Sequence, residues 1–93
     1  MIRSFRSRGT ERIWQGHVSR GLSAEIQDRA LHKLRQLDAA RTLEDLRNPP
    51  GNRLEALHGD RKGQLSIRIN DQWRICFRWD TGDALEVEIV DYH

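Results

Sequence analysis

The chain has 93 residues, which suffice for one domain with a modest hydrophobic core, and its single cysteine, Cys76, excludes an internal disulfide. No stretch approaches the roughly 20 apolar residues that a bilayer span requires, and residues 1–8 lack the apolar region of a secretory signal. We therefore expect one cytoplasmic domain over residues 1–93 with no membrane association.

The net charge of +2 conceals an asymmetry along the chain. Residues 1–78 contain all 16 basic and nine acidic residues, a balance of +7, whereas residues 79–93 contain five acidic residues, a balance of −5. Fourteen of the basic residues are arginine, whose planar guanidinium binds phosphate and stacks on bases. This composition suits nucleic-acid contact, although arginine is also a common surface residue.

The N-terminal third predicts a short strand and a short helix. Residues 2–5 form the strand, with Ile2 packed inward. Thr10 is a suitable N-cap and Gly16 a suitable stop for a helix that turns Ile13 inward.

The clearest helix follows Ser23, a good N-cap residue. Its apolar residues recur at helical spacing and form one stripe over about four turns: Ile26, Ala30, Leu34 and Leu37, with Leu31 beside them. Arg29 and Lys33 lie on the other face, which is either a nucleic-acid contact or simply solvated.

A capping box and two prolines divide the helical half of the chain from the sheet half. Thr42 and Asp45 have the spacing of a capping box that starts a one-turn helix. Pro49 and Pro50 end it, and residues 54–58 predict the next strand.

Three later segments alternate apolar and polar residues, as half-buried strands do. Their apolar positions are Leu65, Ile67 and Ile69; Trp73, Ile75, Phe77 and Trp79; and Leu85, Val87 and Ile89. A three-residue loop at 70–72 keeps the apolar faces together and pairs Arg68 with Arg74, and the second hairpin also needs an odd loop around 81–82. The prediction is an α+β fold: a small, mostly antiparallel, twisted sheet of four to five strands with two N-terminal helices packed on one face.

The opposite, polar face of this sheet carries three arginines and two glutamates: Arg68, Arg74, Arg78, Glu86 and Glu88. Opposite charges on neighbouring strands pair favourably. Since the arginines outnumber the glutamates, we expect one arginine to remain for a phosphate or an oxyanion.

Six side chains suited to RNA cleavage without a metal converge near one end of the predicted sheet: His58, Arg61, Arg74, Asp91, Tyr92 and His93. Such cleavage needs a base for the 2′-hydroxyl, a cation for the charge on phosphorus and an acid for the leaving oxygen. The four histidines and one cysteine lack metal-ligand spacing, so no metal site is expected. Ser66 and Cys76 have no histidine beside them in the predicted pairing, which argues against nucleophilic catalysis.

The residues 52–63, 66–77 and 87–93 resemble the HigB (plasmid maintenance killer) toxins of the RelE/ParE superfamily, and residues 1–5 and 37–40 extend the likeness over essentially the whole chain. The most specific features of this resemblance are the motifs Asn70-x-x-Trp73-Arg74-Ile75 and Asp91-Tyr92-His93. The resemblance implies ribosome-dependent, metal-independent cleavage of mRNA in the decoding site, with no cofactor.

The resemblance also implies roles and partners. It assigns catalysis to Arg74, Asp91, Tyr92 and His93, with His93 or Asp91 as the base, and RNA or phosphate binding to His58, Arg61, Lys62, Arg68 and Glu55. The implied partners are a HigA-like helix-turn-helix antitoxin, the ribosome with its mRNA, and operator DNA in a higher-order toxin–antitoxin complex.

This chain departs from the family pattern at two positions of the implied site. His58 stands where the family commonly has lysine, and Glu55 stands where some members have histidine. Two alternatives stay open: a ParE-like toxin that binds DNA gyrase, since the same superfamily includes such members, and a weakened toxin that mainly binds its antitoxin. The terminal Asp91-Tyr92-His93 argues against the gyrase binder, because binding alone does not require it.

Overall fold

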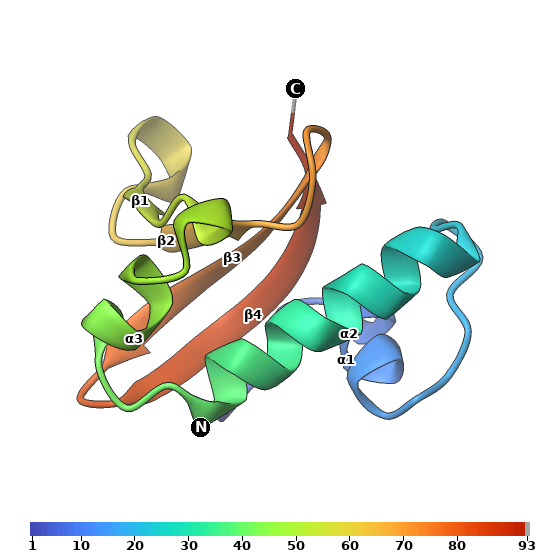
Figure 1. The fold of residues 1–93 in the computed structure, drawn as a ribbon, viewed down its shortest axis with the longest axis horizontal. Helices are drawn as coiled ribbons and strands as arrows, with labels where there is room; N and C mark the ends of the chain where they lie inside the picture. The colour runs from blue at the N-terminus through green and yellow to red at the C-terminus, as the bar shows by residue number, and fades with distance from the viewer. Residues whose placement is uncertain (93) are drawn as a thin grey trace.

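The computed structural model describes residues 1–92. Its elements are α1 (Arg8–Trp14), α2 (Ala24–Ala39), α3 (Leu43–Arg47), the 3-10 helix η1 (Pro50–Asn52), β1 (Glu55–Ala56), the 3-10 helix η2 (Gly59–Arg61), β2 (Leu65–Arg68), β3 (Trp73–Asp80) and β4 (Asp83–Asp91). The strands form one antiparallel sheet in the order β1-β2-β3-β4, and α2 runs across it (Figure 1). The predicted α+β class with an antiparallel sheet and helices is confirmed. None of the helices within residues 1–92 combines the length and apolar character that a membrane crossing requires.

The helix α2 forms where its apolar stripe and its cap predict it. The Ser23 hydroxyl accepts a hydrogen bond from the backbone N–H of Ile26, which satisfies one free donor of the first turn. Ala30, Leu34 and Leu37 are fully buried in the core. Their burial against the sheet supplies the main stabilisation of this helix.

The helix α1 begins earlier than the sequence predicts. Ser7, not Thr10, is its N-cap, and the Ser7 hydroxyl accepts from the backbone N–H of Thr10. Thr10 is instead buried, and its Oγ1 accepts a 2.9 Å hydrogen bond from the backbone N–H of Ile89 in β4. The predicted cap is wrong because Thr10 joins the helix to the sheet.

The segment between α2 and β2 is held by polar contacts. The capping box of Thr42 and Asp45 is present at the start of α3, as predicted. The predicted strand over 54–58 is reduced to β1 (Glu55–Ala56), because Arg53 at φ 44° and Gly59 at φ 64° turn the chain on either side. The strand β1 therefore pairs only with Leu65 and Ser66 of β2.

The first hairpin has the predicted register and the second does not. Arg68 lies opposite Arg74, as predicted. The second hairpin closes with the two residues Thr81 and Gly82, both at positive φ, rather than with an odd loop. A β-bulge on β4 restores the parity that an odd loop would have supplied: Glu86, at φ 52°, and Val87 together face the single residue Phe77 of β3.

The bulge also changes which side chains of β4 reach the core. Leu85 lies opposite Arg78, on the polar face, so the prediction that it shares a face with Val87 and Ile89 is wrong. Ala84 takes its place and is fully buried with Val87. A register shift of one residue moves every following side chain to the other face, which explains the exchange.

Residues 1–6 run beside β4 without forming a strand. Isolated parallel bridges join Ile2 to Ala84 and Phe5 to Val87. The backbone N–H of Arg3 donates to the Ala84 carbonyl at 2.8 Å, and that of Val87 donates to the Ser4 carbonyl at 3.0 Å. The predicted opening strand is thus present only as this bridged segment.

Candidate active site

Arg74 is the central cation of the polar face of the sheet. It projects from β3, only 9% of the residue is exposed, and its Nε donates a 2.7 Å hydrogen bond to Oγ of Ser66 on β2. Its Nη2 donates to the Arg53 carbonyl at 2.6 Å and lies 3.9 Å from Oε1 of Glu55. These contacts fix the plane of the guanidinium.

Arg74 nevertheless keeps a donor for a ligand. Throughout residues 1–92, every buried side-chain nitrogen or oxygen has a hydrogen-bond partner. The hydrogen bonds of Arg74 use Nε and Nη2. Its Nη1 must therefore reach solvent, where it can donate to an anion.

A second guanidinium is held nearby by the turn η2. Nη1 of Arg61 donates to Oε1 of Gln64 at 3.0 Å and to Oε1 of Glu88 on β4 at 3.2 Å. Gln64 is buried, so its amide is a fixed support. Arg61 thus reaches over the polar face from the loop between β1 and β2.

The charges of two guanidiniums and two carboxylates act on the thiol of Cys76. Burial raises the pKa of the Cys76 thiol; Arg61 and Arg74 oppose that rise, and Glu88 and Glu55 add to it. The thiol is fully buried and stays protonated near neutral pH, so it is no nucleophile. Its position shows that all four charged groups lie within electrostatic reach of one point.

The sheet arginines are more fully paired than the sequence predicts. Arg68 forms an ion pair with Asp71, Arg74 lies near Glu55, and Nε of Arg78 donates to Oε2 of Glu86 at 2.5 Å. Glu88 pairs with Arg61 rather than with a sheet arginine. The expectation of one unpaired arginine is wrong, because Glu55 and Asp71 supply carboxylates from outside the two long strands.

The strand β4 holds the end of the described chain beside the loop at 70–72. Asp91 lies opposite Trp73, and its Oδ2 accepts a 3.2 Å hydrogen bond from Nε2 of Gln72. The backbone N–H of Tyr92 donates to the Gln72 carbonyl at 2.6 Å, and 41% of Tyr92 is exposed. His93, one of the two residues predicted as the base, lies outside the described residues.

The register separates Asp91 from Arg74. Arg74 is opposite Val90, and Asp91 is opposite Trp73, which packs against the core. Because successive side chains alternate between faces, Asp91 is directed to the helix side of the sheet and Arg74 to the polar side.

The remaining predicted residues lie at the rim. His58 is exposed at the N-cap position of η2, Lys62 is exposed just after η2, and Glu55 is exposed on the edge strand β1. The structure thus brings Glu55, Arg61 and Arg74 together, with His58 and Lys62 beside Arg61. Arg68 lies one strand away, opposite Arg74.

Two supports of the site were missed from the sequence, namely Ser66 and Gln64. Ser66 was considered only as a nucleophile, although the register that pairs Arg68 with Arg74 already brings Ser66 within reach of Arg74. Gln64 gives no comparable signal, because its role depends on how the loop containing η2 folds back over the sheet.

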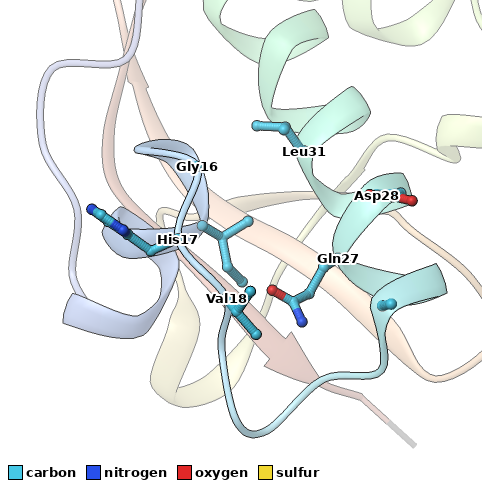
Figure 2. A pocket seen from close by; sticks show the side chains of 8 residues that line it. Gly16, His17, Val18, Gln27, Asp28 and Leu31 are labelled. Atoms are coloured by element: carbon cyan, nitrogen blue, oxygen red, sulfur yellow. The ribbon is translucent and has the colours of Figure 1, made fainter.

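A separate cavity lies between α1 and α2, away from these charged groups. Its volume is about 200 Å³, and Val18 and Gln27 point towards each other across it, whereas His17 and Asp28 point away (Figure 2). Gln27 is occupied in holding the loop, since its Nε2 donates to the carbonyls of Ser19 and Leu22. Within residues 1–92, no group of three or more histidine, cysteine or acidic side chains is arranged to hold a metal ion.

Comparisons with known proteins point to one family. The family described as the RelE-like toxin of type II toxin–antitoxin system HigB matches residues 3–93. The "Toxin HigB-1" of Vibrio cholerae is 41% identical over 86 residues, covering 91% of this chain and 90% of the relative. The "Endoribonuclease HigB" of Proteus vulgaris is 36% identical over 93 residues, covering 100% of both chains. A solved YoeB/ParE toxin from Agrobacterium tumefaciens aligns with 99% of this chain and 96% of its own, at 18% identity and a TM-score of 0.49.

Proposed function

This chain belongs to the HigB family of RelE-like toxins from type II toxin–antitoxin systems, and we propose that it is an endoribonuclease that cleaves mRNA on the ribosome. Its relative from Proteus vulgaris is named an endoribonuclease. The toxin domain spans residues 1–93 and acts in the cytoplasm.

The observation that carries the proposal is the pair of immobilised guanidiniums, Arg61 and Arg74. Both are held by neutral partners, Gln64 and Ser66, as well as by carboxylates. Preorganised donors aimed at developing charge are an effective way to lower the barrier of a phosphoryl-transfer step. We therefore propose that Arg61 and Arg74 bind the scissile phosphate. On binding, the phosphate replaces Glu55 as the partner of Arg74.

The chemistry needs no metal. The 2′-oxygen of the ribose attacks phosphorus while His93 takes the 2′-hydroxyl proton. The bond to the 5′-oxygen breaks as water gives that oxygen a proton, and a 2′,3′-cyclic phosphate remains. Arg61 and Arg74 stabilise the negative charge that builds on phosphorus. Tyr92 stacks on a neighbouring base and orients it. Asp91 holds the strand end through Gln72, because its register sets it on the face away from Arg74.

The exposed residues around η2 extend this surface. His58 and Lys62, both exposed, contact the RNA backbone beside Arg61. Membership in a type II family implies an antitoxin as partner. We assign it to the HigA-like helix-turn-helix class, which binds operator DNA together with the toxin.

The test uses purified protein, ribosomes carrying a defined mRNA, and mapping of new RNA 5′ ends. The native chain should produce cuts phased with the codons. His93→Gln should reduce the cleavage rate by about 10²–10⁴-fold, the usual effect of losing a general base. Tyr92→Phe removes only the hydroxyl, so it should retain most activity if Tyr92 acts by stacking.

A matched control is His17→Gln, which changes an exposed histidine just after α1, outside the proposed site, and should cleave like the native chain. Absence of codon-phased cuts by the native chain, combined with inhibition of DNA gyrase supercoiling, would overturn the proposal in favour of the gyrase-binding class.

A further inference from the structure

We propose that Arg29, Lys33 and Arg68 form a second phosphate-binding site, which holds the RNA backbone next to the Arg61–Arg74 pair. This inference rests on the proposed function, since it extends the RNA path of the same molecule. The site combines Arg29 and Lys33 of α2 with Arg68 of β2. From the sequence pattern alone, these residues would be assigned to different surfaces.

Lys33 is fixed in place by a buried amide. Its Nζ donates a hydrogen bond to Oδ1 of Asn52, which is fully buried at the end of η1. The Asn52 Nδ2 donates to Oε1 of Gln36 at 3.2 Å and to the Leu46 carbonyl at 3.1 Å. Because both bonds orient the amide, its oxygen is directed at Lys33 and the ammonium is held at a defined point on the surface.

Two further cations act on this ammonium. Partial burial lowers the pKa of Lys33 most, and the charges of Arg29 and Arg68 lower it further. Arg29 is exposed one turn earlier on α2, and β2, the strand that carries Arg68, contacts η1, whose Asn52 holds Lys33. Like charges gathered in this way repel each other, and a bound polyanion relieves that repulsion.

Among residues 1–92, Asp71 is the carboxylate that forms an ion pair with this group, and it does little to neutralise it. The side chain of Asp71, the ion-pair partner of Arg68, is 99% exposed. Water screens such a surface pair strongly, so it contributes little and an RNA phosphate can replace it. The group therefore presents a positive surface to a ligand.

The group is continuous with the proposed active site. Arg68 lies directly opposite Arg74 in the β2–β3 ladder, where paired residues are about 5 Å apart. The strand β1 stops pairing at Ser66, so it does not cover β2 at Arg68. A single RNA strand can thus contact Arg74 and then pass over Arg68 to Lys33 and Arg29 on α2.

The test measures binding of a short single-stranded 2′-O-methyl RNA, which cannot be cleaved, by fluorescence anisotropy between about 50 and 200 mM salt. Arg29→Gln and Lys33→Gln should each weaken binding about three- to tenfold and reduce the slope of log affinity against log salt by about 0.7. The matched control is Arg35→Gln, an exposed arginine of α2 two residues from Lys33 and so on another face. Thermal unfolding of each variant verifies that the fold is retained.

Equal RNA affinities for Lys33→Gln and Arg35→Gln would overturn the inference while leaving mRNA cleavage by the native chain untouched. Native protein that fails to cut mRNA on the ribosome would overturn the proposed function, yet a selective loss of RNA binding in Lys33→Gln would still support this site. If Lys33→Gln binds RNA as the native chain does but no longer binds a poly-glutamate peptide, the site recognises an acidic protein partner, and the nucleic-acid assignment is overturned.

Discussion

The Oγ of Ser66 accepts a 2.7 Å hydrogen bond from Nε of Arg74, and this contact orients the guanidinium from the neighbouring strand. Both residues are buried, Ser66 completely. A neutral hydroxyl is well suited to this task, since it holds the cation without competing with a phosphate for its charge. Ser66 is therefore a positioning residue for Arg74.

Ser66→Ala should lower both stability and cleavage. The change leaves Nε of Arg74 without its partner in a buried site, which costs about 1–3 kcal/mol of unfolding free energy. Arg74 also loses its fixed orientation, so we expect cleavage of ribosome-bound mRNA to fall about tenfold or more. Urea unfolding and single-turnover cleavage measure the two effects.

Ser23→Ala is the matched control for that prediction. It removes the hydroxyl that caps α2, at a cost of about 0.5–2 kcal/mol, but lies away from the polar face of the sheet. Both variants should be destabilised to a similar extent, and only Ser66→Ala should lose activity. Equal activity in the two folded variants would show that Ser66 does not position Arg74.

Glu88→Gln should strengthen binding of RNA. Glu88 holds Arg61 at 3.2 Å, and its side chain is 22% exposed, so its negative charge opposes an incoming phosphate. Gln64 still supports Arg61 in the variant. The partly exposed ion pair is worth roughly 0.2–1 kcal/mol, which corresponds to a gain in RNA affinity of up to about fivefold. Weaker binding of RNA by the variant would contradict this prediction.

Glu86→Gln is the comparison for Glu88→Gln. It removes the same charge from the same strand, but at the pair with Arg78. We expect a smaller change in RNA affinity, because Arg78 is not part of the Arg61–Arg74 pair. Fluorescence anisotropy with the same RNA measures both variants.

The buried thiol of Cys76 predicts a loss of stability in alkaline solution. Burial raises the pKa of Cys76 in the folded protein above the value of 9.0 for an ordinary thiol. The unfolded chain therefore loses this proton first, so the contribution to stability is complete below about pH 9 and is lost as the pH rises through the pKa of the folded state. Urea unfolding at pH 8 and pH 10 should show a steeper decline for the native chain than for Cys76→Ala.

The difference in unfolding free energy between the native chain and Cys76→Ala reports on the thiol alone. This comparison is needed because other groups titrate in the same pH range. The pKa of Lys33 is lowered in the fold, and that contribution has the opposite sign. It is present in both proteins and cancels in the comparison. Parallel declines for the native chain and Cys76→Ala would mean that the thiol is not responsible.

The sequence was sufficient for elements specified by local patterns. The stripe of Ala30, Leu34 and Leu37 with the Ser23 cap predicts α2, and the alternation around residues 70–72 predicts the pairing of Arg68 with Arg74. In each case one face must be buried, so a change of register would expose several apolar side chains at once. Such patterns leave few alternatives.

The sequence was insufficient where geometry depends on distant segments. The bulge at Glu86 could not be predicted from the sequence, because glutamate rarely adopts a φ of 52°. This bulge places Leu85 on the polar face and not in the predicted core. The ion-pair partners Glu55 and Asp71 come from outside the long strands, so counting charges along those strands overestimated the free cations. The placement of Asp91 away from Arg74 follows only from the register of β3 and β4.

The bridged segment at residues 1–6 occupies the outer edge of β4. An uncovered strand edge presents backbone donors and acceptors that recruit strands of other chains and so promote aggregation. Here the N–H of Arg3 and the carbonyl of Ser4 already use those groups at Ala84 and Val87. The first few residues of the toxin therefore cover this edge of the sheet, and their removal would expose β4 as a template for intermolecular strand pairing.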